Sequence, residues 1–198
     1  LWEIGVPMGV IAAIVPSTNP TSTVCYKAII ALKSGNSIVF SPHPKALFCT
    51  LKAAEIVRAA AEKAGAPKGS IGCLGIASMA GCQELMTAPQ VRLILATGGP
   101  GMVKAAYSSG KPAIGVGAGN GPVYIHHTAD IKQALKSILR SKTFDNGTVC
   151  ASEQSIIVEK DMESRVKEEA SQMGFYFMNT QEAGLLAKHL FRPDGSLN

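Results

Sequence analysis

The sequence predicts an α/β protein with a doubly wound parallel sheet, followed by part of a second α/β domain. In the first half, short apolar runs rich in β-branched residues alternate with segments whose apolar residues recur at helical spacing. Glycines then occupy alternate positions from Gly115 to Gly121, a composition typical of a domain junction. We therefore expect one domain over residues 1–119 and the start of another over residues 120–198.

The first three elements follow one another closely. Residues 10–15 form an apolar run that predicts the first strand. Pro20 and the hydroxyl residues after it suit the start of a helix, which should run through Leu32 because Gly35 is suited to end it. Residues 38–40 predict the second strand.

An amphipathic helix comes next. Pro44 suits its first turn, and Gly65 is placed to end it. Its apolar residues recur at helical spacing, at Leu47, Leu51, Ala54, Val57 and Ala61. A strand over residues 71–74 and a short helix over residues 79–86 follow.

A buried strand over residues 91–96 runs directly into the glycine turn Thr97-Gly98-Gly99-Pro100-Gly101. Because glycines permit close backbone approach and the next helix offers N–H donors to phosphate, a dinucleotide is the natural ligand. The spacing differs from Gly-x-Gly-x-x-Gly, so a purely structural turn stays open as the alternative. No acidic residue follows the second strand to bind a ribose, since that segment reads Ser41-Pro42-His43-Pro44.

The remaining elements begin with short strands at residues 114–116 and 123–125. A helix over residues 130–142, a polar turn, a strand over residues 155–158 and two further helices complete the chain. So few strands predict an incomplete second domain. The chain opens on Leu1 without a start methionine, so we also expect the natural beginning of the first domain to be missing.

Composition excludes several classes of protein. Lys and Arg number 19 against 14 Asp and Glu, but the basic residues are scattered, which argues against a nucleic-acid partner. No apolar stretch is long enough to span a bilayer, and no signal-peptide pattern is present. The five cysteines show no paired short spacing and favour reduced thiols. We expect a cytoplasmic protein with no membrane partner.

Cys150 is the candidate nucleophile. It lies in the polar, glycine-containing turn between a predicted helix and a predicted strand, whereas the other four cysteines lie in apolar sequence settings. Neighbouring backbone N–H groups there can stabilise a thiolate or an oxyanion. No His or Lys close in sequence identifies an activating base, so an inert, half-buried cysteine stays open as the second interpretation.

Neither the histidines nor the lysines indicate a metal or catalytic site. His126 and His127 are adjacent on a predicted strand, so we expect their side chains to point to opposite faces and to be unable to share a metal ion. No other metal-ligand spacing occurs, and we predict no metal site. Lys27, Lys33 and Lys104 are expected to be solvated helix charges.

Taken together, four segments resemble coenzyme A-acylating aldehyde dehydrogenases in order and spacing. They are Ile14-Val15-Pro16-Ser17-Thr18-Asn19-Pro20, Ser41-Pro42-His43-Pro44, Leu95-Ala96-Thr97-Gly98-Gly99-Pro100-Gly101-Met102-Val103 and Ser141-Lys142-Thr143-Phe144-Asp145-Asn146-Gly147. The resemblance covers essentially the whole chain. It extends to the aldehyde dehydrogenase half of bifunctional aldehyde-alcohol dehydrogenases and to acetaldehyde and propionaldehyde dehydrogenases.

This resemblance implies an aldehyde dehydrogenase fold, with a Rossmann-type NAD domain and a catalytic domain that carries Cys150 as nucleophile. Cys150 would attack a short-chain aldehyde, by default acetaldehyde; a hydride would pass to NAD, and the acyl group would move to the thiol of coenzyme A. The reverse reaction reduces acyl-coenzyme A. By the same resemblance, cofactor contacts fall on Ile14, Val15, Pro16, Ser17, Thr18, Asn19, Ser41, Pro42, His43, Gly98, Gly99 and Gly117.

Several positions depart from the hydrolytic members of the family. Their water-activating glutamate aligns with Val116, which disfavours water as the acyl acceptor, because a thiol is the better nucleophile. Their ribose-binding lysine and glutamate align with Ser41 and Pro44, which leaves NADP as an alternative to NAD. Their oxyanion-binding asparagine aligns with Thr18, and Asn19 follows it, so either residue is a candidate donor beside the backbone N–H of Cys150.

Two further functions stay open: a catalytically silent NAD-binding or assembly fragment, and a hydrolytic aldehyde dehydrogenase that uses another base. The resemblance implies a homo-oligomer, and a filament if the parent protein is bifunctional. It also leaves open a location in a bacterial microcompartment.

Overall fold

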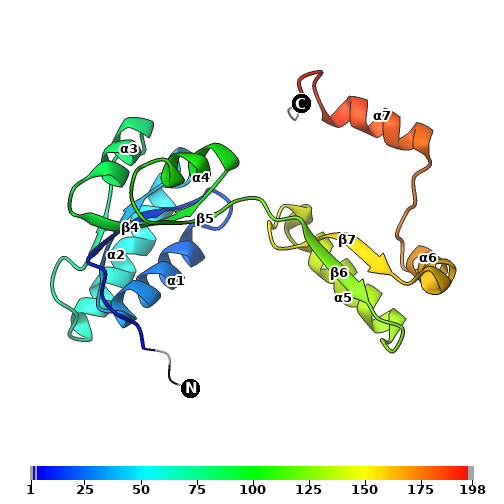
Figure 1. Cartoon of the computed structure of the whole chain (residues 1–198), viewed down its shortest axis with the longest axis horizontal. Coiled ribbons are helices and arrows are strands. Elements are labelled where there is room, and N and C mark those ends of the chain that lie inside the picture. Colours follow the sequence, from blue (N-terminus) through cyan, green and yellow to red (C-terminus); the bar gives the residue numbers. More distant parts are fainter. Residues whose placement is uncertain (1, 3, 196–198) are drawn as a thin grey trace. The chain divides into compact units, whose positions relative to one another are not determined.

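The computed structural model describes residues 2 and 4–195, which divide into two compact units, Leu1–Gly119 and Asn120–Asn198 (Figure 1). Each unit has its own hydrophobic core. None of the helices in this described part combines the length and the apolar character that a membrane span requires.

The first unit is built on a parallel five-stranded sheet, as the sequence predicts. Its strands are β1 (Val10–Ile14), β2 (Ser37–Ser41), β3 (Ile71–Cys73), β4 (Val91–Thr97) and β5 (Ala113–Val116), arranged in the order β3-β2-β1-β4-β5. The connecting helices are α1 (Pro20–Lys33), α2 (Leu47–Lys63), α3 (Met79–Thr87) and α4 (Pro100–Tyr107).

The two faces of this sheet are covered by different helices, because successive side chains of a strand point in opposite directions. On β1, Ile11 and Ala13 pack into the core formed with α1 and α2. The alternate residues Ala12 and Ile14 pack into the core formed with α3 and α4. The sheet is therefore doubly wound, and β1 is buried on both sides (Figure 1).

The ends of the helices largely follow the predicted signals. Gly35 and Gly65 have φ angles of 74° and 101°, a backbone conformation in which glycine carries no steric penalty, and they follow the ends of α1 and α2. The helix expected from Pro44 instead begins with a separate 3-10 turn, η1 (Pro44–Ala46), in which His43 Nδ1 accepts a hydrogen bond from the Lys45 N–H. The α-helix itself starts at Leu47.

The second unit contains a two-stranded parallel sheet among the residues described. Its strands are β6 (Gly121–Ile125) and β7 (Glu153–Val158), joined through α5 (Ile131–Thr143) and the 3-10 turn η2 (Phe144–Gly147). The turn η3 (Lys160–Met162) and the helices α6 (Glu163–Gln172) and α7 (Thr180–Leu190) follow. The core is formed by Ile125 and Met162 together with buried residues of α5 and α6.

Candidate active site

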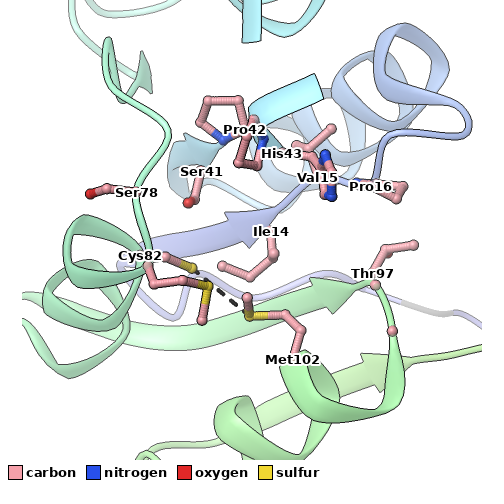
Figure 2. Close-up of a pocket in the computed structure, with 14 residues that line it drawn as sticks. Ile14, Val15, Pro16, Ser41, Pro42, His43, Ser78, Cys82, Thr97 and Met102 are labelled. Atoms are coloured by element: carbon pink, nitrogen blue, oxygen red, sulfur yellow. Dashed lines mark hydrogen bonds between the residues drawn. The ribbon is translucent and has the colours of Figure 1, made fainter. Parts of the chain in front are cut away.

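A cavity of about 300 Å³ lies at the carboxyl ends of β1, β2 and β4 in the first unit (Figure 2). Its lining is mostly apolar. The lining residues are Ile14, Val15, Pro16, Ser41, Pro42, His43, Pro44, Ser78, Met79, Cys82, Thr97, Gly98, Gly99 and Met102. Eight of the residues to which the sequence assigned cofactor contacts are among them, namely Ile14, Val15, Pro16, Ser41, Pro42, His43, Gly98 and Gly99.

The strand order explains why a cavity forms at this edge. Beyond β1 the chain first adds β2 and β3 on one side of the sheet, then returns to add β4 and β5 on the other. The loops that leave β1 and β4 therefore diverge, and in open parallel sheets ligands bind at such a switch point. The β1–β4 boundary is consequently the best candidate for a nucleotide site in this unit.

The glycine turn after β4 leaves its backbone accessible. A Cβ atom added at Gly99 would meet no atom within 4 Å, so packing within the described structure does not require glycine there. Gly98 has less space, because a Cβ atom added there would lie 3.4 Å from Met102 Cβ. The N–H of Gly98 donates a hydrogen bond to the Val116 carbonyl oxygen at 3.1 Å. Open backbone beside the start of α4 suits the approach of a phosphate group.

Polar groups at the end of β2 line the same cavity. Ser41 is buried, and its carbonyl oxygen accepts a hydrogen bond from the Val15 N–H at 3.0 Å. His43 uses Nδ1 to accept from the Lys45 N–H, which leaves Nε2 for other contacts. The lining contains no carboxylate among the residues described, so the ribose-binding aspartate or glutamate of many dinucleotide sites has no counterpart here.

Four of the predicted cofactor residues do not line the cavity. Ser17, Thr18 and Asn19 lie in the exposed loop between β1 and α1. Asn19 occupies the N-cap position of α1 without capping it through its side chain, and its Oδ1 accepts a hydrogen bond from the Thr18 hydroxyl at 3.3 Å. The Asn19 amide group is thus not consumed by helix capping. Gly117 instead packs against the glycine turn, where an added Cβ would lie 3.8 Å from the Gly98 carbonyl oxygen.

Sequence reasoning missed the side chains that α3 and α4 contribute. Cys82 is buried, and its Sγ lies 3.9 Å from Met102 Sδ, within the cavity lining (Figure 2). Ser78 lines the cavity and also caps α3, accepting a hydrogen bond from the Gly81 N–H at 3.0 Å. The apolar setting of Cys82 indicated burial, but nothing in the sequence placed α3 beside β1.

The expectation that Lys27 is a solvated helix charge is wrong. Its side chain is only 2% exposed, and Nζ donates to the carbonyl oxygens of Ile14 and Leu95, each at 2.8 Å. Burial lowers the pKa of Lys27 to about 7. Because α1 packs on the sheet at this point, the long side chain of Lys27 reaches backbone carbonyl groups of both β1 and β4.

Cys150 lies in an irregular turn of the second unit, between η2 and β7, and is exposed. Three consecutive residues before it, Asp145, Asn146 and Gly147, have φ angles of 50°, 52° and 74°. Thr148 stabilises this turn, because its hydroxyl donates to the Asp145 carbonyl oxygen at 2.6 Å and to Asp145 Oδ2 at 2.9 Å. Backbone strain of this kind in non-glycine residues is concentrated at functional sites.

The segment after Cys150 is held by Ser152, which is 3% exposed. Both the N–H and the hydroxyl of Ser152 donate to the Val149 carbonyl oxygen, at 3.1 and 2.9 Å. Lys142 Nζ lies 3.4 Å from Ser152 Oγ. Cys150 is therefore exposed on a turn whose two flanks are fixed by hydrogen bonds.

Exposure alone does not distinguish Cys150 from the other cysteines. Cys25 on α1 and Cys49 on α2 are also exposed, although their sequence settings are apolar. The reason is that an amphipathic helix has a solvent face, whatever residues adjoin it in sequence. Cys150 differs from both in lying on a turn with left-handed backbone.

The expectation for His126 and His127 is also wrong. Strand β6 ends at Ile125, so both histidines lie in the turn that follows and the alternation of strand side chains does not apply. Their ring centroids are 3.9 Å apart, and both side chains are exposed. They are on one side of the unit and not on opposite faces.

Comparison with known proteins gives a consistent result. The chain matches the sequence model of the aldehyde dehydrogenase family over residues 3–173. It is 54% identical over 195 residues to the bifunctional aldehyde-alcohol dehydrogenase of Escherichia coli (strain K12), covering 98% of this chain and 22% of that protein. The chain thus spans about a fifth of the length of that relative.

Solved structures that superpose on this chain are also aldehyde dehydrogenases. A probable aldehyde dehydrogenase from Listeria monocytogenes superposes with a TM-score of 0.89 at 55% identity, covering 98% of this chain and 43% of that one. A propionaldehyde dehydrogenase from Rhodopseudomonas palustris, solved with bound CoA and an acylated cysteine, superposes with a TM-score of 0.85 at 35% identity, covering 98% and 44%. The chain thus spans less than half of either structure.

Proposed function

Because this chain belongs to the aldehyde dehydrogenase family, we propose that it carries the cofactor cleft and the nucleophile of a coenzyme A-acylating enzyme. The enzyme would oxidise a short-chain aldehyde, by default acetaldehyde, to acyl-coenzyme A with NAD, and would catalyse the reverse reduction. The observation that carries the proposal is the cavity at the β1–β4 switch point, in a chain that also presents Cys150 on a strained, exposed turn.

The cavity fits one half of a dinucleotide. Met79, Cys82 and Met102 form an apolar side suited to a flat heterocycle, and the open backbone at Gly99 is suited to a phosphate. Ser41 and His43 are the candidate ribose partners. We propose NAD as the cofactor. NADP is the alternative, because no carboxylate lines the cavity in the described structure and none would therefore repel its 2′-phosphate.

Cys150 would act as the covalent catalyst. Its thiolate attacks the aldehyde carbon and forms a C–S bond, which converts the carbonyl oxygen into an oxyanion. The backbone N–H of Cys150 is the donor proposed for that oxyanion, and Asn19 and Thr18 are kept as the further candidates that the family resemblance implies. A bound NAD would supply the acceptor for the hydride that leaves the same carbon, so that Cys150 would be left holding the acyl group as a thioester.

Acyl transfer then regenerates the nucleophile. The thiolate of coenzyme A attacks the thioester carbon, the C–S bond to Cys150 breaks, and acyl-coenzyme A leaves. Aldehyde, coenzyme A and NAD are consumed, and acyl-coenzyme A, NADH and one proton are released. Val116 supports this route over hydrolysis, because a valine at the end of β5 cannot activate a water molecule.

Two alternative functions stay open. Since the chain spans 22% of the length of the E. coli relative, a catalytically silent NAD-binding fragment is the second candidate function. Hydrolysis by another base is the third. Homo-oligomer formation, a filament if the parent protein is bifunctional, and a location in the cytoplasm or a bacterial microcompartment are proposals that follow from the same family membership.

The test of the nucleophile uses acyl exchange, which requires no hydride transfer. The 198-residue chain is incubated with acetyl-coenzyme A, and acetylation is mapped by mass spectrometry. We expect acetylation at Cys150 to be at least about tenfold faster than at the exposed Cys25 and Cys49, which serve as internal controls. Equal rates at the three thiols would overturn the assignment, and Cys150→Ala should abolish the fast phase.

The proposed cofactor site is tested separately, by titrating the chain with NADH and following the fluorescence of NADH. Gly99→Val should weaken binding at least about tenfold, because its side chain would fill space that a phosphate needs. Gly75→Val is the matched control, since a Cβ there also meets no atom within 4 Å and Gly75 does not line the cavity. Binding of NADH without acetylation of Cys150 would favour the silent fragment.

A further inference from the structure

Three metal-ligating side chains gather at one edge of the second unit. Strands β6 and β7 are parallel, with Ile125 opposite Val158, so the residues that follow the two strands emerge side by side. These residues are His126, His127 and Glu159. One ligand atom from each, an imidazole nitrogen or a carboxylate oxygen, lies within 4.8 Å of the other two.

The contacts among these groups are specific. His127 Nδ1 lies 3.2 Å from Glu159 Oε1, and the Tyr124 hydroxyl donates to the same oxygen at 2.8 Å. His126 Nδ1 lies 2.8 Å from the Thr128 hydroxyl oxygen. Both histidines are exposed and Glu159 is half-buried, so the cluster is accessible in this unit.

We propose that His126, His127 and Glu159 bind a divalent transition-metal ion of the zinc type. Two imidazoles and one carboxylate suit Zn²⁺, Co²⁺ or Ni²⁺, whereas Mg²⁺ and Ca²⁺ prefer ligand sets made entirely of oxygen. Three protein ligands leave the fourth position of a tetrahedral ion to water.

The geometry requires only a small adjustment. With metal–ligand bonds of about 2.0–2.2 Å, tetrahedral ligand atoms lie roughly 3.3–3.6 Å from one another. The present separations of up to 4.8 Å close to that value by rotation of exposed side chains, which packing does not oppose. Tyr124 and Thr128 then serve as outer partners that orient Glu159 and His126.

This cluster is distinct from the turn that carries Cys150. Cys150 precedes the amino end of β7, and Glu159 follows its carboxyl end. The strand between them accounts for about 17 Å at the usual rise per residue. An ion bound at the cluster would therefore not coordinate the Cys150 sulfur within this unit, and the proposal does not depend on the proposed enzymatic function.

The competing explanation is a surface hydrogen bond between His127 and Glu159, with His126 merely stacked beside it. The two explanations differ in what His126 contributes. In a hydrogen-bonded pair His126 is dispensable, whereas a metal ion needs it as a ligand.

The test titrates the full 198-residue chain with Co²⁺ and follows the visible absorption of the ion. Cysteine thiols are first alkylated with iodoacetamide in every sample, because the exposed Cys25, Cys49 and Cys150 are competing soft ligands. We expect one equivalent of Co²⁺ to bind, with displacement by Zn²⁺. His126→Ala, His127→Ala and Glu159→Gln should each weaken binding by about tenfold to a hundredfold or more.

Two controls keep the result interpretable. His189→Ala, on α7, should leave binding unchanged, and circular dichroism checks that each variant is folded. Tyr124→Phe should weaken binding without abolishing it, because it removes an outer partner of Glu159 and no ligand. Absence of stoichiometric binding, or full binding by His126→Ala, would overturn the proposal.

Discussion

Lys27 Nζ lies 2.8 Å from the carbonyl oxygen of Leu95, a residue 68 positions further along the chain. The same nitrogen donates to the Ile14 carbonyl oxygen, so one side chain links the carboxyl-terminal parts of the neighbouring parallel strands β1 and β4, where the order of strand addition reverses. A neutral amine has two N–H donors, which is enough for both carbonyl groups. The link therefore persists when Lys27 loses its charge.

The first prediction concerns the pH dependence of stability. Burial lowers the pKa of Lys27 to about 7 in the folded chain, against an ordinary value of 10.5. Between these values the unfolded chain binds more protons at this residue, so the contribution of Lys27 to the free energy of unfolding rises with pH across that window. Denaturant unfolding of the wild-type chain and of Lys27→Met isolates this contribution, because other titrating groups are shared.

The wild-type chain should therefore gain stability relative to Lys27→Met as the pH is raised from about 7 to 10.5. The difference should be constant below that window. A difference that does not change with pH would show that Lys27 titrates as an exposed lysine does.

The second prediction compares two glycines of the β5 region. A Cβ atom at Gly115 would lie 2.6 Å from Val103 Cγ1 and 2.9 Å from Tyr107 Cε2, and both side chains are carried by α4. Gly115→Ala should therefore destabilise the chain by about 1–3 kcal/mol through overpacking. Gly117→Ala is the matched control, since its nearest neighbour would be at an ordinary 3.8 Å, and its effect should be within about 0.5 kcal/mol. Equal losses in urea unfolding would contradict the packing of α4 on β5.

The sequence predicts helices and strands better than it predicts which residues contact one another across them. All five strands of the first unit were expected, because a strand buried on both faces leaves a continuous apolar run such as the one in β1. The partners of Lys27 were not predictable, since they are backbone groups on two other elements. His126 was misplaced for a different reason: the end of β6 decides whether side chains alternate, and strand ends carry weak signals.

In the candidate site too, single segments were predictable from the sequence, whereas contacts between distant elements were not. Local signals predicted the glycine turn, because it directly follows a buried strand, whereas the residues after β1 and β2 were assigned only through the family resemblance; residues from all three segments line the cavity. The contribution of α3, including Cys82, depends on how helices pack across the sheet. Exposure of Cys25 and Cys49 likewise depends on which face of each helix is covered.

The third prediction compares two threonines that are both fully buried on helices. Thr23 Oγ1 has no hydrogen-bond partner in the described structure, whereas Thr50 Oγ1 donates to the Ala46 carbonyl oxygen at 2.8 Å. Thr23→Val removes an unsatisfied hydroxyl and should be neutral or stabilising by up to about 1 kcal/mol. Thr50→Val should destabilise by about 0.5–1.5 kcal/mol. If thermal or urea unfolding ranks the two variants in the reverse order, Thr23 has a partner in solution.

The fourth prediction tests the turn that presents Cys150. Gly147 has a φ of 74°, and an added Cβ would lie 3.2 Å from the Lys142 carbonyl oxygen, so Gly147→Ala is opposed by both backbone conformation and space. We expect the rate of Cys150 acetylation by acetyl-coenzyme A to fall at least about tenfold, because the turn must rearrange. Gly174→Ala, also at positive φ but with no atom within 4 Å, carries the backbone penalty without the clash and lies after α6. It should leave the acetylation rate unchanged. If both variants slow acetylation equally, general destabilisation of the second unit is responsible, and the left-handed turn has no specific part in the reactivity of Cys150.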